Sequence, residues 1–190
     1  CSSPREQVVL RGATMGTTYS VQLVDPPQTV EPAVLQEQVD DVLADINAVM
    51  STYDAGSELS RFNASSSTDW YGVSAELAGV VAVAQGVRAA SGGAFDVTVG
   101  PLVNLWGFGP GDGSRVPPDP ERVRAAKLRT GYGKLDVRRS PPALRKAVPD
   151  LYVDLSAIAK GYGVDRVAAL LETAGVEDYL VEIGGELLAR

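Results

Sequence analysis

Residues Tyr152 to Gly185 read YVDLSAIAKGYGVDRVAALLETAGVEDYLVEIGG, and this stretch does most to decide the fold. An apolar strand is predicted to end at Asp154, and Ser156 follows with a hydroxyl that can cap a helix. The helix should run for about four turns, with Lys160 one turn in, and stop at Gly175 before a second strand. Because a helix N-terminus presents N–H groups and a favourable dipole to anions, the segment predicts a site for a phosphate-bearing ligand.

The composition indicates one globular domain and argues against a nucleic-acid binder. The chain has 190 residues, 45% of them apolar and 22% charged, and its net charge is −7. Nucleic-acid binders normally carry a stripe of cations, which this acidic balance does not suggest. Histidine is absent from the sequence, which excludes Ser-His-Asp and Cys-His catalysis and histidine metal ligands within these residues. No apolar run reaches the roughly eighteen residues that a membrane-spanning helix needs.

The single cysteine of the chain is Cys1, and Ser2 and Ser3 follow it. A chain that opens on its only cysteine resembles a bacterial lipoprotein after removal of the signal peptide, with the lipid on Cys1. The alternative is a chain boundary that falls on a cysteine by chance. The lack of an internal thiol fits an oxidising compartment. We therefore expect residues 1–10 to tether a periplasmic protein to the membrane through a lipid anchor only.

The order of the predicted elements favours an α+β fold. Apolar residues within 31–50 recur at helical spacing and indicate a helix packed on a core: Leu35, Val39, Val42, Ile46 and Val49. Residues 51–72 and 94–118 are predicted to be mostly loop. The remaining predictions are a strand at 17–24 after a tight turn, helices at 75–90 and 120–127, and strands at 132–137, near Ala147 and at 151–155. Helices and strands alternate without strict β-α-β order, which argues against a doubly wound sheet.

Four loops stand out for their small and polar residues. They are GATMGTT at 12–18, MSTYD at 50–54, SGGAFDVTVGPL at 91–102, and the start of the segment quoted first. Glycine lets a backbone approach a ligand closely, and hydroxyls and backbone N–H groups can hold phosphate oxygens. Each loop alone is more often a simple turn than a binding site.

Taken in order, the stretches TMGTTY, STYD, GGAFDVTVGPLVNLWGFG and VDLSAIAKGYGVD resemble the FAD:protein FMN transferase family, the ApbE-type periplasmic lipoproteins. The resemblance runs from about residue 12 to residue 185. It implies an α+β fold with a mixed, largely antiparallel sheet flanked by helices. It also implies that residues 11–190 form an FAD-binding FMN transferase domain, and a lipid on Cys1 is consistent with this family.

The resemblance assigns several residues to the flavin. Met15 and Tyr53 would line the flavin pocket, where a thioether and an aromatic ring suit a flat, polarizable ligand. Ala94, Phe95 and Asp96 would contact FAD, with the Asp96 carboxylate accepting hydrogen bonds from the ligand. The residues themselves leave alternatives open: Met15 and Tyr53 as ordinary core residues, and Asp96 as a cap for the following turn. Trp106 and Phe108 either pack their own loop or stack on the flavin.

The quoted segment would supply the phosphate end of the site. By resemblance, Asp154 and Lys160 bind FAD, with Lys160 close to the diphosphate. The backbone carbonyl of Ala157 would bind Mg²⁺, a cation that takes oxygen ligands. A solvated lysine is the alternative for Lys160, but the helix dipole disfavours a cation there, so an anionic partner is the better interpretation.

The implied activity is Mg²⁺-dependent transfer of FMN from FAD to a threonine hydroxyl of a target protein, with release of AMP. Such targets would be flavoproteins such as subunits of the Na⁺-translocating quinone reductase or of Rnf-type complexes. Family members continue beyond the Gly-Gly strand with a histidine-containing H-x-x-D-P-type segment and an acidic loop that completes the metal site. Nothing in these 190 residues matches either, so we expect the domain to be incomplete at its C-terminus, with catalytic residues beyond Arg190.

Other functions remain open at this point. Hydrolysis of FAD to FMN and AMP, a flavin-binding lipoprotein without transfer activity, and a surface-anchored interaction module are three of them. A serine acyl hydrolase that uses Ser156 with Lys160 is a fourth. That chemistry needs S-x-x-K with an S-D-N or K-T-G partner, whereas the chain has S-x-x-x-K and neither partner motif.

Overall fold

The computed structural model describes residues 5–110 and 116–190, so the predicted lipidation site at Cys1 lies outside the described residues. The sequence led us to expect a single domain, whereas the chain divides into two compact units. Unit 1 comprises Cys1–Asn47 and Ala159–Arg190, and unit 2 comprises Ala48–Ile158. Within the described residues, no helix is long and apolar enough to cross a membrane.

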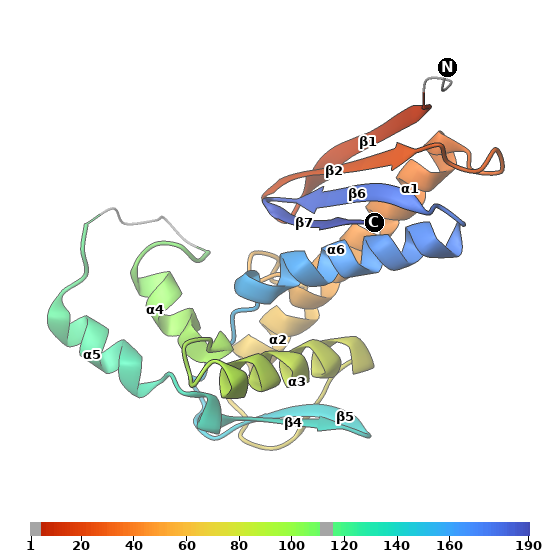
Figure 1. The fold of residues 1–190 in the computed structure, drawn as a ribbon. Coiled ribbons are helices and arrows are strands. Elements are labelled where there is room, and N and C mark those ends of the chain that lie inside the picture. The colour runs from red at the N-terminus through yellow and green to blue at the C-terminus, as the bar shows by residue number, and fades with distance from the viewer. Residues whose placement is uncertain (1–4, 111–115) are drawn as a thin grey trace. The chain divides into compact units, whose positions relative to one another are not determined.

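Unit 1 is built on a four-stranded antiparallel sheet in the order β1-β2-β6-β7 (Figure 1). Its strands are β1 (Gln7–Thr14), β2 (Thr17–Val24), β6 (Asp178–Ile183) and β7 (Glu186–Ala189). The strand at 17–24 and the strand running into Gly184 are confirmed. Residues 7–10, assigned to the tether from the sequence, instead form the first half of β1 and pair with 21–24 of β2.

Two helices pack on this sheet, α1 (Pro32–Met50) and α6 (Ser156–Thr173). The core of unit 1 takes every second residue of the two central strands, because side chains alternate between the faces of a sheet. Tyr19, Val21 and Leu23 come from β2, and Tyr179, Val181 and Ile183 from β6. The helix predicted at 31–50 is therefore confirmed, but its buried stripe is Leu35, Val39, Leu43, Ile46 and Met50. Val42 is half-buried and packs against this core, whereas Val49 is half-buried and is not part of it.

The C-terminus of α6 is closed at Gly175, as the sequence predicted. Gly175 has φ +78, and its N–H donates to the carbonyl of Glu172. The N–H of Val176 donates to the carbonyl of Leu171, and both of these side chains are buried. These two hydrogen bonds, together with the buried pair Leu171 and Val176, define a Schellman motif. Its left-handed position suits glycine, which has no Cβ.

Unit 2 contains a three-stranded antiparallel sheet in the order β3-β5-β4 and several short helices (Figure 1). The strands are β3 (Tyr71–Gly72), β4 (Leu135–Arg139) and β5 (Pro142–Lys146). The helices are α2 (Glu58–Ala64), α3 (Ala75–Ala90), η1 (Val97–Val99), α4 (Gly100–Leu105), α5 (Pro120–Leu128) and η2 (Tyr132–Lys134). The predicted caps of α3 and α5 are confirmed, since Ser74 accepts from the N–H of Leu77 and Asp119 from that of Glu121.

Several predictions for unit 2 were wrong. The expected loops at 51–72 and 94–118 contain α2 and α4, whose 7 and 6 residues are too few to show a hydrophobic period. The strand expected at 132–137 begins only at Leu135, after the turn of η2, and the strand near Ala147 ends at Lys146. Residues 151–155 are not a strand, because their backbone hydrogen bonds go to a side chain and to an irregular turn instead of to a neighbouring strand.

Candidate functional site

The segment that leads into α6 is an extended, buried stretch of unit 2. Leu151, Val153 and Leu155 are each 0% exposed, and Asp154 between them is 6% exposed. The N–H of Asp154 donates to the carbonyl of Val97 at 2.8 Å. Its carboxylate Oδ1 accepts the N–H of Ser156 at 2.8 Å, so Ser156 is the first helical residue and Asp154 supplies the polar contact that we assigned to the serine hydroxyl.

The backbone immediately before Asp154 is held by a residue that the sequence did not single out, Asn63. Its Nδ2 donates to the carbonyl of Val153 at 2.8 Å, and its Oδ1 accepts the N–H of Val153 at 2.9 Å. One side-chain amide thus makes the two bonds that a paired strand residue would make. The signal available in the sequence was weak, because an asparagine at the end of a short helix is usually a simple cap.

Asp96 stands at the start of η1 and accepts three hydrogen bonds within unit 2. Its Oδ1 accepts the N–H and the hydroxyl of Thr98 at 2.8 and 2.7 Å, and its Oδ2 accepts the N–H of Tyr132 at 3.1 Å. The Thr98 hydroxyl in turn accepts the N–H of Gly131 at 2.7 Å. The capping role considered for Asp96 is therefore present, and its contact with FAD stays a prediction.

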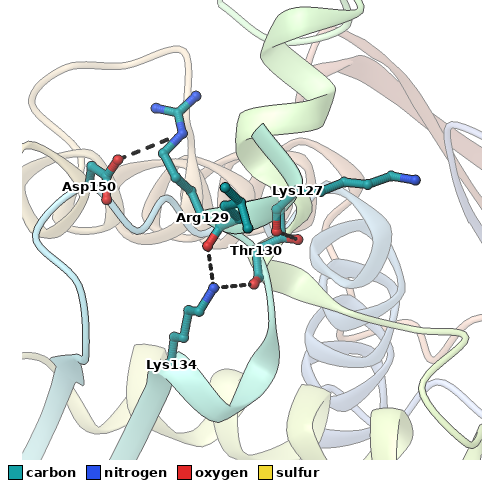
Figure 2. Close-up of polar contacts among 6 residues, drawn as sticks. Lys127, Arg129, Thr130, Lys134 and Asp150 are labelled. Atoms are coloured by element: carbon teal, nitrogen blue, oxygen red, sulfur yellow. Dashed lines mark hydrogen bonds and ion pairs between the residues drawn. The ribbon is translucent and has the colours of Figure 1, made fainter. Parts of the chain in front are cut away.

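The turn that reaches Asp96 is fixed at the end of α5 (Figure 2). The ammonium of Lys134 donates to the carbonyls of Leu128 and Thr130, the latter at 2.8 Å. A cation suits the carbonyls at a helix C-terminus, where the dipole is negative. Arg129 also forms an ion pair with Asp150 at 3.7 Å, immediately before the segment that carries Asp154.

Ala94 and Phe95 lie in the glycine turn between α3 and η1. Gly92 and Gly93 have φ +62 and +91, a conformation that side chains rarely adopt. The N–H of Phe95 donates to Oγ of Ser91 at 3.1 Å. Ala94 is exposed and Phe95 half-buried, so the turn offers its backbone to solvent while its position is fixed by Ser91.

Tyr53 is 67% exposed, and its hydroxyl donates to the carbonyl of Phe108 at 2.9 Å. The core alternative for Tyr53 is therefore wrong. Phe108 is 76% exposed and Trp106 is 45% exposed, so these aromatic side chains are not packed inside their loop. Exposed aromatic side chains of this kind can stack on a flat ligand.

Tyr152 joins these groups, although no sequence pattern pointed to it. Its ring fills the space beside Gly100, where an added Cβ would lie 2.3 Å from Tyr152 Cδ1. Burial raises the pKa of Tyr152, and a hydrogen bond with Asn104 offsets part of this rise. The nearby Asp154 and Tyr53 raise the pKa of Tyr152 further. Unit 2 therefore brings Tyr53, Tyr152 and Asp154 into one neighbourhood.

Unit 1 supplies two of the predicted site residues, Met15 and Lys160. Met15 occupies the β1–β2 turn at φ +49 and is half-buried, packed against the core of unit 1. Met15 packs closely over Gly163, since a Cβ added at Gly163 would lie only 3.3 Å from Met15 Cε. Lys160 is half-buried, and its Cδ would lie 3.3 Å from a Cβ added at Gly184. Gly184 thus leaves room for the lysine stem.

Ala157, the predicted Mg²⁺ ligand, is exposed in the first turn of α6. In the part of the chain that the structure describes, no three Asp, Glu, Cys or His side chains gather as they would around a metal ion. The oxygen donors at the start of α6 are backbone carbonyls and the Asp154 carboxylate. Such a sparse oxygen set fits Mg²⁺ only when phosphates and water complete the shell.

Comparison with known proteins identifies the family. The ApbE family matches residues 15–190, so the chain belongs to the ApbE family. It is 47% identical over 187 residues to the FAD:protein FMN transferase of Vibrio cholerae, covering 98% of this chain and 55% of that protein. It is 44% identical over 194 residues to the FAD:protein FMN transferase of Haemophilus influenzae, covering 100% of this chain and 56% of that protein. The chain therefore spans about half the length of these curated relatives.

Solved structures agree with the fold. The flavin transferase ApbE from Vibrio cholerae has a TM-score of 0.94 at 46% identity, covering 98% of this chain and 60% of that one. The apo form of the Pseudomonas stutzeri flavinyl transferase ApbE has a TM-score of 0.90 at 39% identity, covering 100% of this chain and 62% of that one. The α+β architecture with antiparallel sheets flanked by helices is thus confirmed.

Proposed function

We propose that these residues form the FAD-binding part of an FAD:protein FMN transferase. The observation that carries the proposal is the buried Asp154 at the start of α6, whose carboxylate accepts the N–H of Ser156 while its own N–H donates to the carbonyl of Val97. Hydrogen bonds stabilise a buried carboxylate, and the donor groups of a ligand would add to the single N–H of Ser156. The names of the relatives, which describe transfer of FMN from FAD to protein, support the choice of ligand.

The proposed reaction joins FMN to a threonine hydroxyl of the target protein. The hydroxyl oxygen attacks the phosphorus on the FMN side of the diphosphate, and its proton passes to water. The bond from that phosphorus to the bridging oxygen breaks, and AMP leaves with this oxygen. When bound, Mg²⁺ would neutralise charge on the diphosphate, and the Ala157 carbonyl is the protein ligand that we propose for it.

The residues of this chain would mainly bind and orient FAD. Lys160 would place a compact positive charge near the diphosphate. This charge would stabilise the negative charge that builds up on the AMP phosphate as AMP leaves. Tyr53 would stack on the flavin, and the exposed turn at Ala94 and Phe95 would contact the nucleotide. Holding the diphosphate in line with the attacking hydroxyl is the main contribution expected of such a site.

A direct test uses the protein at its full natural length. It is incubated with FAD, Mg²⁺ and a candidate target such as a quinone reductase or Rnf-type subunit, and the products are separated by denaturing electrophoresis. The proposal predicts a fluorescent target band and one AMP for each flavin attached. AMP and free FMN without a fluorescent band would indicate hydrolysis, and FAD retained unchanged would indicate a binding protein; either result contradicts the transferase.

We also propose that the protein is a periplasmic lipoprotein anchored through Cys1. The support is that Cys1 is the only cysteine in these 190 residues and that a lipid on it is consistent with the family resemblance. Mass spectrometry of the N-terminal peptide from the native membrane fraction should find the lipid on Cys1. An unmodified Cys1 thiol in protein recovered from that fraction would contradict the anchor.

A further inference from the structure

Unit 2 contains a buried lysine that the proposed reaction does not use. Lys146 on β5 is 1% exposed, and its ammonium donates to the carbonyls of Asn63 and Ser65 at 2.9 and 2.7 Å. It also lies 4.9 Å from the centroid of the Phe62 ring. Burying an ammonium is costly unless it is paired, and the carbonyls at the end of α2 provide that pairing. Burial lowers the pKa of Lys146, with Asp150 opposing the shift.

The residue that Lys146 holds is the same one that holds the segment before α6. Asn63 accepts the lysine through its backbone carbonyl and binds both backbone groups of Val153 through its side chain. These contacts join positions 83 and 90 residues apart in the sequence. The next peptide along is fixed from the other side, because the N–H of Asp154 donates to Val97.

Neither residue is placed to touch a ligand directly. Lys146 is enclosed, and its ammonium is already bonded to two carbonyls. The Asn63 amide is engaged at both its nitrogen and its oxygen by Val153. Asn63 bonds Val153, the residue before Asp154. Any effect of Asn63 or Lys146 on ligand affinity must therefore come from a change in the position of the Asp154 carboxylate.

We propose that Asn63, anchored by Lys146, is a positioning residue that sets the backbone of Asp154 for binding of the FAD diphosphate end. This inference rests on the proposed function. A side-chain amide replaces a neighbouring strand here, so a segment without strand partners is held rigid while its carboxylate stays directed to the start of α6. The lysine prevents α2 from fraying, which would otherwise release the asparagine.

Two variants and one control test the proposal in the full-length protein. Asn63→Ala removes the amide but keeps the carbonyl that Lys146 binds, and Lys146→Met removes the anchor. Val81→Ala truncates a 0% exposed residue of α3 and controls for simple loss of stability. Each protein is studied well below its own thermal midpoint, by amide hydrogen exchange of peptides covering 151–157 and by FAD titration.

We expect faster exchange at Val153 and Asp154 in both variants. The FAD affinity should be about tenfold lower, because the Asp154 carboxylate would no longer be held in position to hydrogen-bond the ligand. Val81→Ala should change neither. The double variant should lose no more affinity than the worse single variant, because the two residues act in series.

Several results would overturn the positioning role. They are unchanged exchange at 151–157 in Asn63→Ala, faster exchange with wild-type FAD affinity, and additive losses in the double variant. If the wild-type protein binds no FAD, while Asn63→Ala still speeds exchange at 151–157, the proposed function is rejected and with it the ligand role of Asn63. The exchange measurement thus separates the two failures. If Lys146→Met does not fold, Asn63→Ala alone decides the outcome.

Discussion

At the scale of single residues, the two glycines Gly184 and Gly185 differ in the space that they leave for the Lys160 side chain. Gly184 has φ +55, and an added Cβ would lie 2.7 Å from Thr17 Cγ2 and 3.3 Å from Lys160 Cδ. Gly185 has φ +99, but nothing lies within 4 Å of its added Cβ. The two glycines therefore differ in contact but share a backbone conformation that would strain any other residue.

This difference gives a matched pair of variants. Gly184→Ala and Gly185→Ala should each lower the free energy of unfolding by about 1 kcal/mol or more, because alanine is strained at positive φ. Only Gly184→Ala should displace the Lys160 stem, so only it should weaken FAD binding beyond the effect of stability. Equal FAD affinities in a titration of the two variants would contradict a role for Lys160 in binding.

A second residue-scale prediction concerns Tyr19, which is 2% exposed and donates to Oδ1 of Asp40 at 2.6 Å. Burial raises the pKa of Tyr19 well above its ordinary value of 10.0, and Asp40 adds to the rise. The unfolded chain therefore ionises first, so the stability linked to Tyr19 is present below pH 10 and falls as pH rises above it. Tyr19→Phe should lose stability at neutral pH and show a shallower fall above pH 10 in urea unfolding. An unchanged alkaline slope would contradict the assignment.

At the scale of elements, the short helix α2 depends on its cap. Ser57 is 0% exposed; its hydroxyl accepts the N–H of Ser60 at 3.0 Å and donates to the carbonyl of Ser51 at 2.5 Å. A helix of 7 residues has little stability of its own, so capping and tertiary contacts maintain it. Since α2 ends at the residues that Lys146 holds, its cap also supports Asn63.

We predict that Ser57→Ala lowers the free energy of unfolding by about 1–2 kcal/mol, since a cap and a buried carbonyl both lose a partner. Ser66→Ala, at an exposed site after α2, should change it by less than about 0.5 kcal/mol. Chemical denaturation of both variants measures the difference. Equal stabilities would mean that α2 does not need its cap.

Long periodic elements were predictable from the sequence, and short ones were not. The helix at 31–50 and the capped helices after Ser74 and Asp119 follow from local signals that repeat or stand at fixed positions. By contrast, α2 and α4 are too short for a period, and residues 151–155 look like a strand because they are apolar and buried. What replaces their strand partner is Asn63, 90 residues away, and no local pattern can indicate that contact.

At the scale of the whole molecule, the sequence predicted the family and the α+β class but not the division into two units. The predicted site residues fall in both units, with Met15 and Lys160 in one and the other six in the second. The ordered motifs carried the family, because they are specific as a set. The supporting residues Asn63, Tyr152 and Lys146 could not be found this way, since their roles come from packing between distant segments.

The central claim is that Asp154 and Lys160 bind FAD, and an equilibrium titration of FAD onto the full-length protein tests it most directly. Asp154→Ala and Lys160→Ala should each weaken binding by about tenfold to a hundredfold, as expected when a charged hydrogen-bonding partner is lost. Lys127→Ala removes an exposed cation of α5 that points away from its neighbours in Figure 2, and should leave the affinity unchanged. Wild-type affinity in both Asp154→Ala and Lys160→Ala would contradict the account.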